Sequence, residues 1–235
     1  MKVSIVIPTY EAKGHAISLL RELLYSIQSQ EYKDIEIVIS DHSKDNLVKE
    51  HVDSWKEKMN IVFFKNEKGY GNSSINMNEG IRKASGEIIK IMHMDDVFCN
   101  NTAISKMVDA MSKDASIKWG AFGFTHNYVK EGTIRREVVP AEYQSEVMSD
   151  SALMGCPSVS FFINDGTNFF DENMIIVNDF DMHHRLQKKY GKPFIIEDIS
   201  IIIRIHEDQV TSSLSTYKEK ELEEMNYFKT KNNLI

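Results

Sequence analysis

Apolar and polar positions along the first half of the chain follow two alternating patterns. Continuous apolar or β-branched runs, typical of buried strands, occupy residues 3–8, 35–39, 61–64 and 88–93. Apolar residues at helical spacing occupy residues 17–27, 48–55 and 75–84. Strands that alternate with helices predict a mostly parallel sheet with right-handed crossovers.

The pattern changes after about residue 115. A turn at Glu131-Gly132 between two strand-like runs predicts a hairpin, and a helical pattern over 179–190 stops at Gly191. Residues 217–231 are charged and helix-prone. The strand-like runs of this half are 121–129, 134–139, 194–197 and 200–205. We therefore expect an α/β protein whose first half is Rossmann-like and whose second half is mixed.

Length, charge and cysteine content narrow the class of protein. A chain of 235 residues with 42% hydrophobic residues can bury one full core, so we expect one domain over residues 1–235. A net charge of −7 argues against a nucleic-acid partner. Cys99 and Cys156 lie far apart and predict neither a disulfide framework nor a zinc knuckle. With no secretory leader pattern and no membrane-length apolar run, we expect a cytoplasmic location.

An acidic pair ends the apolar run at residues 88–93. In open α/β sheets ligands bind outside the carboxyl ends of the strands, which is where Asp95 and Asp96 are expected. Two neighbouring carboxylates repel each other unless a cation or a hydrogen-bonded ligand neutralises them. The pair suggests a divalent cation shared with a phosphate-bearing ligand. An isolated Asp-Asp is more often an ordinary solvated turn, and it is the polar residues at the neighbouring strand ends that favour the cation here.

Polar residues also follow the first two predicted strands. Pro8-Thr9-Tyr10-Glu11 ends the first, and Ser40-Asp41-His42-Ser43 ends the second, so both should meet the acidic pair at one edge of the sheet. Thr9 and Asp41 could bind a nucleobase, with the ring of Tyr10 as a flat wall. Taken singly, Asp41 and Ser43 are equally good caps for the next helix.

The order and spacing of these segments resemble the inverting, nucleotide-sugar-dependent glycosyltransferases of family 2, which have the GT-A fold. The resemblance covers most of residues 1 to about 210. The matching stretches are Val3 to Tyr10, Glu36 to Ser43, Asn78 to Ile81, Ala84 to Glu87 and Met94 to Asp96. It implies a nucleotide-sugar-binding half at 1–115, an acceptor and catalytic-base half at 116–214, and a helical tail at 215–235.

The resemblance also assigns roles on the donor side. It implies nucleotide binding by Pro8, Thr9, Tyr10, Glu11, Asp41, Asn78 and Asp95. Asp96 would coordinate Mn²⁺ or Mg²⁺ on the donor diphosphate, and His206, in the closing segment after a strand, would approach the metal or the phosphates. Many family members have an acid or Asn where this chain has His93, which could instead cap a strand end or contact ribose.

The catalytic base is expected in the stretch Val177 to Leu186. The resemblance places it at Asp179, where a carboxylate would take the proton of the acceptor hydroxyl as that oxygen attacks the anomeric carbon. Family members often have a further acid where this chain has Asn178, and Asp181 ranks second as base. Asn178 or Asp179 could equally be a helix cap. His183 and His184 are adjacent on a helix, which favours surface or acceptor-side roles over a shared metal.

These features predict transfer of a sugar from a nucleoside-diphosphate sugar, with UDP the preferred nucleotide, to a glycan or lipid-linked acceptor in cell-surface polysaccharide or glycoconjugate synthesis. A lipid-linked acceptor would allow transient contact with the inner face of a membrane. One alternative is a non-catalytic GT-A-like binding module, which the residues at His93 and Asn178 permit. A weaker one is an NAD-dependent oxidoreductase, because Gly69 to Ser74 partly matches a dinucleotide fingerprint.

Overall fold

One sheet organises the protein in a computed structural model that describes residues 1–128, 133–140, 154–206, 209 and 217–234. Its strands are β1 (Val3–Thr9), β2 (Ile35–Asp41), β3 (Ile61–Lys65), β4 (Ile88–Ile91), β5 (Val97–Phe98), β6 (Trp119–Tyr128), β7 (Thr133–Val138), β8 (Ser160–Ile163) and β9 (Phe194–Ile205). Their spatial order is β3-β2-β1-β4-β8-β6-β9-β5, with β7 paired to β6. The predicted turn at Glu131-Gly132 lies outside the described residues.

The two halves of the sheet differ in strand direction. Strands β3, β2, β1 and β4 are mutually parallel, as the alternating pattern predicts. Beyond β4 the pairings are mixed, because β8 runs antiparallel to both β4 and β6, whereas β9 runs parallel to β6. The α/β class with a parallel first half and a mixed second half is therefore confirmed.

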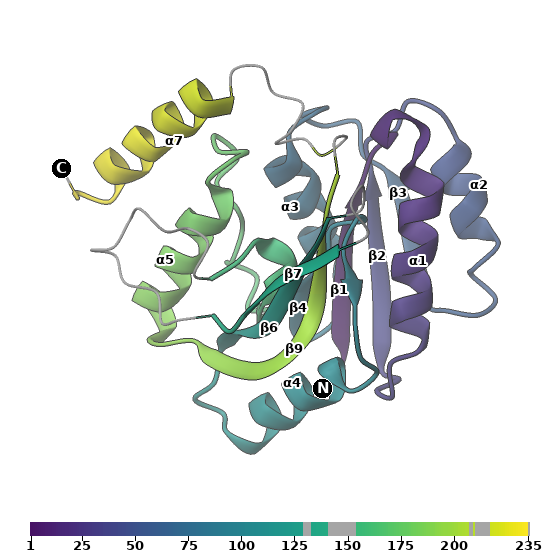
Figure 1. The fold of residues 1–235 in the computed structure, drawn as a ribbon, viewed down its shortest axis with the longest axis horizontal. Coiled ribbons are helices and arrows are strands. Elements are labelled where there is room, and N and C mark those ends of the chain that lie inside the picture. Colours follow the sequence, from purple (N-terminus) through teal and green to yellow (C-terminus); the bar gives the residue numbers. More distant parts are fainter. Residues whose placement is uncertain (129–132, 141–153, 207–208, 210–216, 235) are drawn as a thin grey trace.

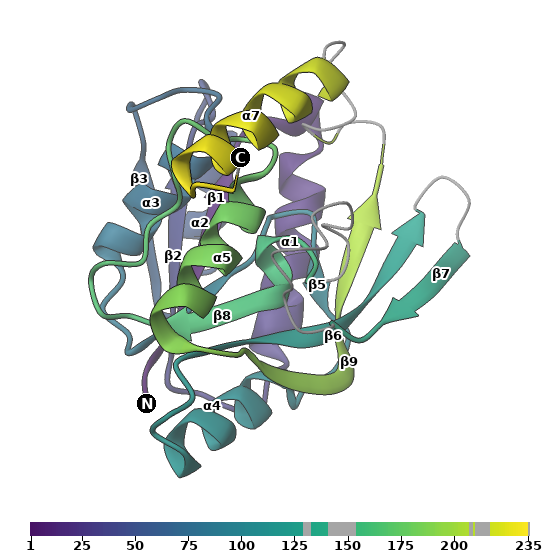
Figure 2. The same ribbon diagram turned by 90° about the vertical axis from the view of Figure 1, so that its left-hand side faces the viewer.

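The helices lie on both faces of the sheet. They are α1 (Ala16–Gln28), α2 (Leu47–Asp53), α3 (Ser73–Lys83), α4 (Ala103–Lys113), α5 (Asn178–Tyr190) and α7 (Tyr217–Lys231). In Figure 1, α1 and α2 flank one side of the parallel strands, and α3 and α5 flank the other. Figure 2 shows α7 lying over α5. The phenyl ring of Phe228 on α7, which is fully buried, meets that of Phe180 on α5 edge-on at 5.9 Å.

Strand β9 differs from the sequence-based prediction. Two separate strands were expected at 194–197 and 200–205, but one strand of 12 residues spans both. Its pairing with β6 shifts register between Phe122 and Phe124, so β9 passes through a bulge and continues. The polar residues Glu197 and Asp198 lie at this bulge. They interrupt the apolar pattern of the sequence, which is why the pattern predicts two strands instead of one.

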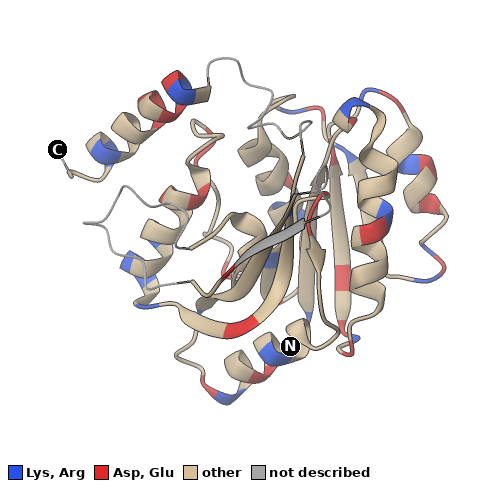
Figure 3. Cartoon of the chain, in the orientation of Figure 1, with Lys and Arg blue, Asp and Glu red and all other residues tan. Residues whose placement is uncertain are grey.

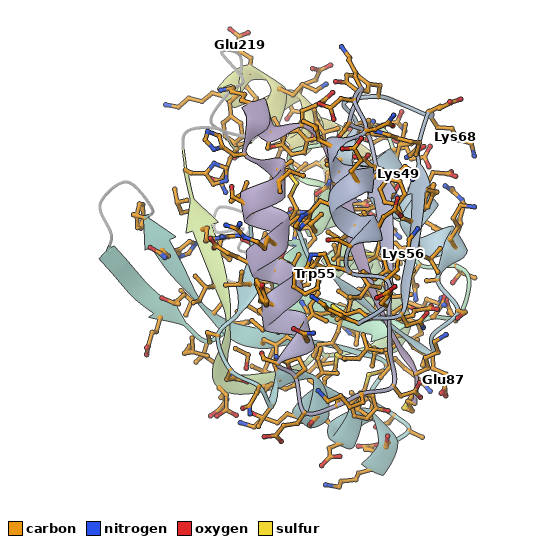
Figure 4. All side chains as sticks on the ribbon, turned by 90° about the vertical axis from the view of Figure 1, so that its right-hand side faces the viewer. Lys49, Trp55, Lys56, Lys68, Glu87 and Glu219 are labelled. Carbon is orange, nitrogen blue, oxygen red and sulfur yellow. The ribbon has the colours of Figure 1, made fainter. Side chains whose placement is uncertain are left out.

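Aromatic and charged residues mark the outer helices. Trp55 lies between α1 and the end of α2 (Figure 4), and its ring meets Tyr25 edge-on at 4.8 Å. Both signs of charge occur along α2, α4 and α7 in Figure 3, as expected for solvated helix faces.

Over the described part of the chain, no helix combines the length and the apolar character that a bilayer crossing requires.

Candidate functional site

A cleft of about 430 Å³ opens at the carboxyl ends of the parallel strands, a volume typical of small-molecule sites. The first half of the chain contributes Pro8, Tyr10, Glu11, His42, Tyr70, Gly71, Ser73, Asn76, His93, Met94, Asp95 and Asp96. The second half contributes Cys156, Pro157, Ile175, Ile176, Val177, Asn178, Asp179, Ile203, Ile205, Gln209, Tyr217 and Glu221. Both halves of the chain, including α7, therefore build one site.

Asp95 and Asp96 lie in this cleft but differ in environment. Asp96 is 2% exposed and accepts a hydrogen bond from the backbone N–H of Arg204 at 3.2 Å. Burial, together with the adjacent Asp95 charge, raises the pKa of Asp96 to about 7. Burial alone would also raise the pKa of Asp95, but its hydrogen bond with His206 and the nearby His93 more than offset this and lower it.

Arg204 on β9 holds the acidic loop and was not assigned a role from sequence. Its guanidinium donates to the carbonyl oxygens of Met94, Asp95 and Leu19, and it forms an ion pair with Glu22 on α1. Arg204 is 6% exposed, so these partners satisfy a charge that would otherwise be buried alone. An arginine directly after the apolar run Ile201-Ile202-Ile203 was the available signal.

The predicted nucleotide-binding residues divide into two groups. Pro8, Tyr10 and Glu11 line the cleft. Thr9 and Asp41 lie fully buried behind the cleft wall, where the Thr9 hydroxyl donates to Asp41 Oδ1 at 3.0 Å.

Asp41 supports the loop that follows β2. It accepts the backbone N–H of Ser43 at 2.9 Å and pairs with Lys65 Nζ at 2.8 Å. It does not cap the next helix, because α2 begins at Leu47 with Asn46 as its N-cap. Contact between Asp41 and a base stays a prediction; the observed contacts are those of a residue that shapes the cleft wall.

Asn78 lies away from the cleft. Its side-chain oxygen accepts the backbone N–H of Phe170 at 2.8 Å, and its amide donates to the Phe170 carbonyl at 2.9 Å and to Glu172 at 3.0 Å. It is 1% exposed, and these bonds join α3 to the segment before α5. Nucleotide contact by Asn78 remains untested, and its placement favours a structural role.

Two aromatic rings extend the cleft wall beyond the predicted residues. The rings of His42 and Tyr70 lie 5.9 Å apart, and Tyr70 is 55% exposed. Asn76 on α3 also lines the cleft, and its amide donates to the Thr9 carbonyl at 3.1 Å. The signal in the sequence is the glycine-rich stretch around Tyr70, which by itself matches part of a dinucleotide fingerprint.

Asp179 lines the same cleft as the acidic pair and lies in the first turn of α5. Val177 occupies the N-cap position of this helix, so neither Asn178 nor Asp179 is its N-cap residue. The Asp179 carboxylate nevertheless accepts the backbone N–H of Phe180 at 2.8 Å within the first turn. Burial raises the pKa of Asp179 to about 7, and the nearby Glu224 adds to the shift. The Asn178 amide donates to Ser74 Oγ at 2.8 Å and ties α5 to α3.

The other polar residues of α5 have structural partners. Asp181 is fully buried, pairs with Arg185 Nε at 2.7 Å and Lys231 Nζ at 2.8 Å, and is absent from the cleft lining. His183 is also buried and its ring stacks on that of Trp119 at 5.9 Å, so a surface position is wrong for it, whereas the acceptor-side alternative stays a prediction. His184 meets Phe228 edge-on at 5.4 Å. Asp181 thus fits the role of second-choice base poorly.

Glu224 on α7 anchors the segment that precedes Asp179. Its carboxylate is 2% exposed and accepts the backbone N–H groups of Ile175, Ile176 and Val177 at 2.8–3.1 Å. Such bonds to a buried anion fix main-chain position strongly. Nothing in the local sequence pairs Glu224 with this segment, which lies 47 to 49 residues earlier.

The residues around Asp96 include two further metal-binding types. Ligand atoms of His93, Asp96 and Cys156 all lie within 4.8 Å of one another. The predicted ligand His206 contacts Asp95 instead, with Nε2 3.2 Å from Oδ2. Carboxylates and an imidazole grouped in one cleft fit a divalent cation.

Comparison with known proteins identifies the family. The family model described as Glycosyl transferase family 2 matches residues 4–165. The chain belongs to glycosyl transferase family 2. A relative in Campylobacter jejuni, GalNAc(5)-diNAcBac-PP-undecaprenol beta-1,3-glucosyltransferase, is 28% identical over 169 residues, covering 68% of this chain and 50% of that protein. The chain thus spans half the length of that curated relative.

Solved structures share the fold. S. aureus TarS 1–349 in complex with UDP-GlcNAc has a TM-score of 0.74 at 18% identity, covering 98% of this chain and 66% of that one. Mannosyltransferase PcManGT from Pyrobaculum calidifontis, in complex with GDP-Man and Mn²⁺, has a TM-score of 0.63 at 15% identity, covering 86% and 56%. The prediction of a GT-A glycosyltransferase fold is confirmed, and family membership leaves the oxidoreductase alternative without support.

Proposed function

We propose that this protein transfers a hexose from a nucleoside-diphosphate sugar to a hydroxyl of a glycan or lipid-linked acceptor, with inversion at the anomeric carbon. The observation that carries the proposal is the shared cleft, which Asp95 and Asp96 from the first half of the chain and Asp179 from the second half all line. A single displacement requires this arrangement, with the leaving group and the base on opposite faces of the sugar.

The first half of the cleft would bind the donor. Tyr10 and Glu11 at the end of β1, and the rings of His42 and Tyr70, offer a polar edge and flat walls for a nucleobase. UDP is the preferred nucleotide, which the UDP-GlcNAc complex of the TarS neighbour supports. Asp95 would face the ribose or the diphosphate.

A divalent cation, Mn²⁺ or Mg²⁺, would be held by Asp96, with His206 reaching the same region through Asp95. When bound, it would neutralise charge on the departing diphosphate. The Mn²⁺ complex of the PcManGT neighbour supports this assignment. The raised pKa of Asp96 also fits, because a cation would relieve the cost of ionising a buried carboxylate beside Asp95.

Asp179 would be the general base. A carboxylate with a pKa of about 7 is a stronger base than an ordinary aspartate and still ionises near neutral pH. Residues 1–115 would form the donor half, 116–214 the acceptor and base half, and 215–235 a helical tail; Tyr217 and Glu221 of that tail line the cleft. The name of the Campylobacter relative, which specifies an undecaprenol diphosphate, supports a lipid-linked acceptor. Such an acceptor would bring the protein into transient contact with the inner face of a membrane.

The first test is a thermal-shift series with nucleoside diphosphates, with and without Mn²⁺, followed by transfer assays with the sugar donors of any nucleotide that binds. A ligand at 100 times its Kd stabilises the protein by about 2.7 kcal/mol. Asp96→Ala should abolish the Mn²⁺-dependent part of the shift, whereas Asp109→Ala on the exposed face of α4 should not. Nucleotide binding without any transfer or hydrolysis would instead support a non-catalytic binding module.

A further inference from the structure

The acidic edge of the cleft contains a thiol beside a carboxylate and an imidazole. Cys156 Sγ lies 3.8 Å from Asp96 Oδ2, and the ligand atoms of these two residues and His93 lie within 4.8 Å of one another. All three side chains line the cleft. Two ligands of a tetrahedral zinc ion at ordinary Zn–S and Zn–O lengths are about 3.6 Å apart, so the Asp96–Cys156 spacing already suits one ion.

His93 is arranged as a ligand rather than as a structural residue. Its backbone N–H is bound by Ser158 Oγ at 2.9 Å, which fixes the main chain at the end of β4. Among the described residues, its imidazole ring has no hydrogen-bonding partner, although it faces the cleft. A histidine that only capped a strand end would use a ring nitrogen to do so.

The loop that carries Cys156 is held firmly. Lys90, fully buried on β4, donates from Nζ to the carbonyl oxygens of Ser158 and Ser160, at 3.3 Å for the second. The short helical turn Pro157–Val159 then leads into β8, the neighbour of β4. Cys156 is thus fixed relative to the strand that leads to His93 and Asp96.

We infer that His93, Asp96 and Cys156 form a mixed nitrogen, oxygen and sulfur site that binds a thiophilic divalent cation, Zn²⁺ or Co²⁺, in preference to Mg²⁺. Thiolate and imidazole ligands favour such ions, whereas Mg²⁺ prefers an all-oxygen shell. Three protein ligands also leave a position open to a further oxygen ligand, as in catalytic zinc sites. The inference rests on the proposed function only in that a diphosphate oxygen would take this position.

The test uses the full chain, freed of metal with a chelator and titrated with Co²⁺ without nucleotide or acceptor. The parent protein should develop thiolate-to-cobalt charge-transfer absorption in the near ultraviolet. Cys156→Ser should lose that absorption and weaken Co²⁺ affinity by more than the 10–100-fold typical of a lost supporting contact. Cys99→Ser is the matched control, because Cys99 is exposed and bonds to the Ile199 carbonyl at 3.0 Å; it should retain the full signal.

A second measurement on the parent protein covers the case in which Cys156→Ser does not fold. Zn²⁺ or Co²⁺ should slow alkylation of Cys156 by iodoacetamide, with Cys99 in the same sample as the reference and Mg²⁺ giving no protection. Absence of the charge-transfer band, or equal protection by Mg²⁺, would overturn the inference. If the protein transfers sugar with Mg²⁺ but shows no cobalt charge-transfer band, this inference is wrong and the proposed function stands. If the protein shows the band but transfers no sugar, the proposed function is wrong and this inference stands.

Discussion

Buried carboxylates at the two ends of the parallel strands have opposite properties. Near the amino ends, Glu36 on β2 accepts from Ser4 Oγ, from the backbone N–H groups of Ser85 and Gly86, and from Lys2 Nζ at 2.8 Å. Burial would raise its pKa, but these donors lower it to about 2. At the carboxyl ends, Asp96 has fewer donors and a pKa raised to about 7.

The contrast agrees with the structural role of Glu36 and with the functional roles proposed for Asp96 and Asp179. Glu36 is stabilised in its ionised form by donors that the fold supplies, so it stabilises the sheet at the amino ends of the parallel strands. Asp96 is buried and Asp179 is half-buried, and neither carboxylate has enough donors to offset the raised pKa, as expected where a ligand or a reacting proton completes the environment. Burial alone does not distinguish the two kinds of acid, whereas the set of donors does.

The largest effect should come from Asp179→Asn. The amide cannot take the acceptor proton, so the transfer rate should fall about 10²–10⁴-fold, with donor affinity retained. The same variant should be more stable at pH 8, because a folded-state pKa of about 7 makes stability fall as pH rises from about 3.8 to 7. Single-turnover transfer and thermal melts between pH 3 and 8 measure both. Full transfer by this variant would move the base elsewhere.

The opposite sign is expected for Glu36→Gln. A pKa lowered from 4.5 to about 2 stabilises the folded protein above pH 4.5, and this stabilisation is lost as pH falls through 2. At about 1.4 kcal/mol per pKa unit, the variant should lose about 3 kcal/mol at pH 7, with nucleotide affinity unchanged in the folded protein. Denaturant unfolding at pH 7 checks this. If the free energy of unfolding of Glu36→Gln at pH 7 is higher than that of the parent protein, Glu36 does not differ from Asp96 in the way described.

Glu224→Gln tests whether Glu224, which does not line the cleft, affects Asp179 by fixing the preceding segment and by raising the pKa of Asp179. The neutral amide oxygen binds the backbone N–H groups of Ile175, Ile176 and Val177 more weakly, which should cost about 1.5–3 kcal/mol of stability. Removing the charge should also lower the pKa of Asp179, so the acid limb of the rate profile should move to lower pH. A pH–rate profile that does not move would limit Glu224 to a structural role.

The smallest effect is expected from Asp41→Asn. Asp41 bonds to Thr9 and Ser43 behind the cleft, so the variant should weaken nucleoside-diphosphate binding by about 0.5–1.5 kcal/mol through the cleft wall. Isothermal titration with UDP and Mn²⁺ measures the change. A much larger loss would indicate direct contact with the base, as the family resemblance implies.

The sequence predicted the features that depend on a pattern within one short segment of the chain. The strands ending at Thr9 and Asp41, and the acidic pair after β4, follow from hydrophobic periodicity and from the rule that parallel strands end at one edge. Asp179 was found only through the family resemblance, since its pattern fitted a helix start equally well.

The remaining features depend on contacts between distant segments. The approach of Cys156 to Asp96 and of Glu224 to Val177 joins residues 60 and 47 positions apart. No periodicity encodes such pairings. The single strand β9 was missed for a related reason, because its polar interruption is accommodated by a bulge against β6 that only the partner strand reveals.

The anchoring of Ile175, Ile176 and Val177 by Glu224 has a consequence for synthesis of the chain. A ribosome makes the parallel strands before α7, so a nascent chain that ends before residue 224 leaves these three amides without their acceptor. The segment that leads to Asp179 therefore acquires its fixed position only after α7 has been made and has packed against it. If Asp179 is the base, transfer activity would appear with that packing rather than growing with chain length.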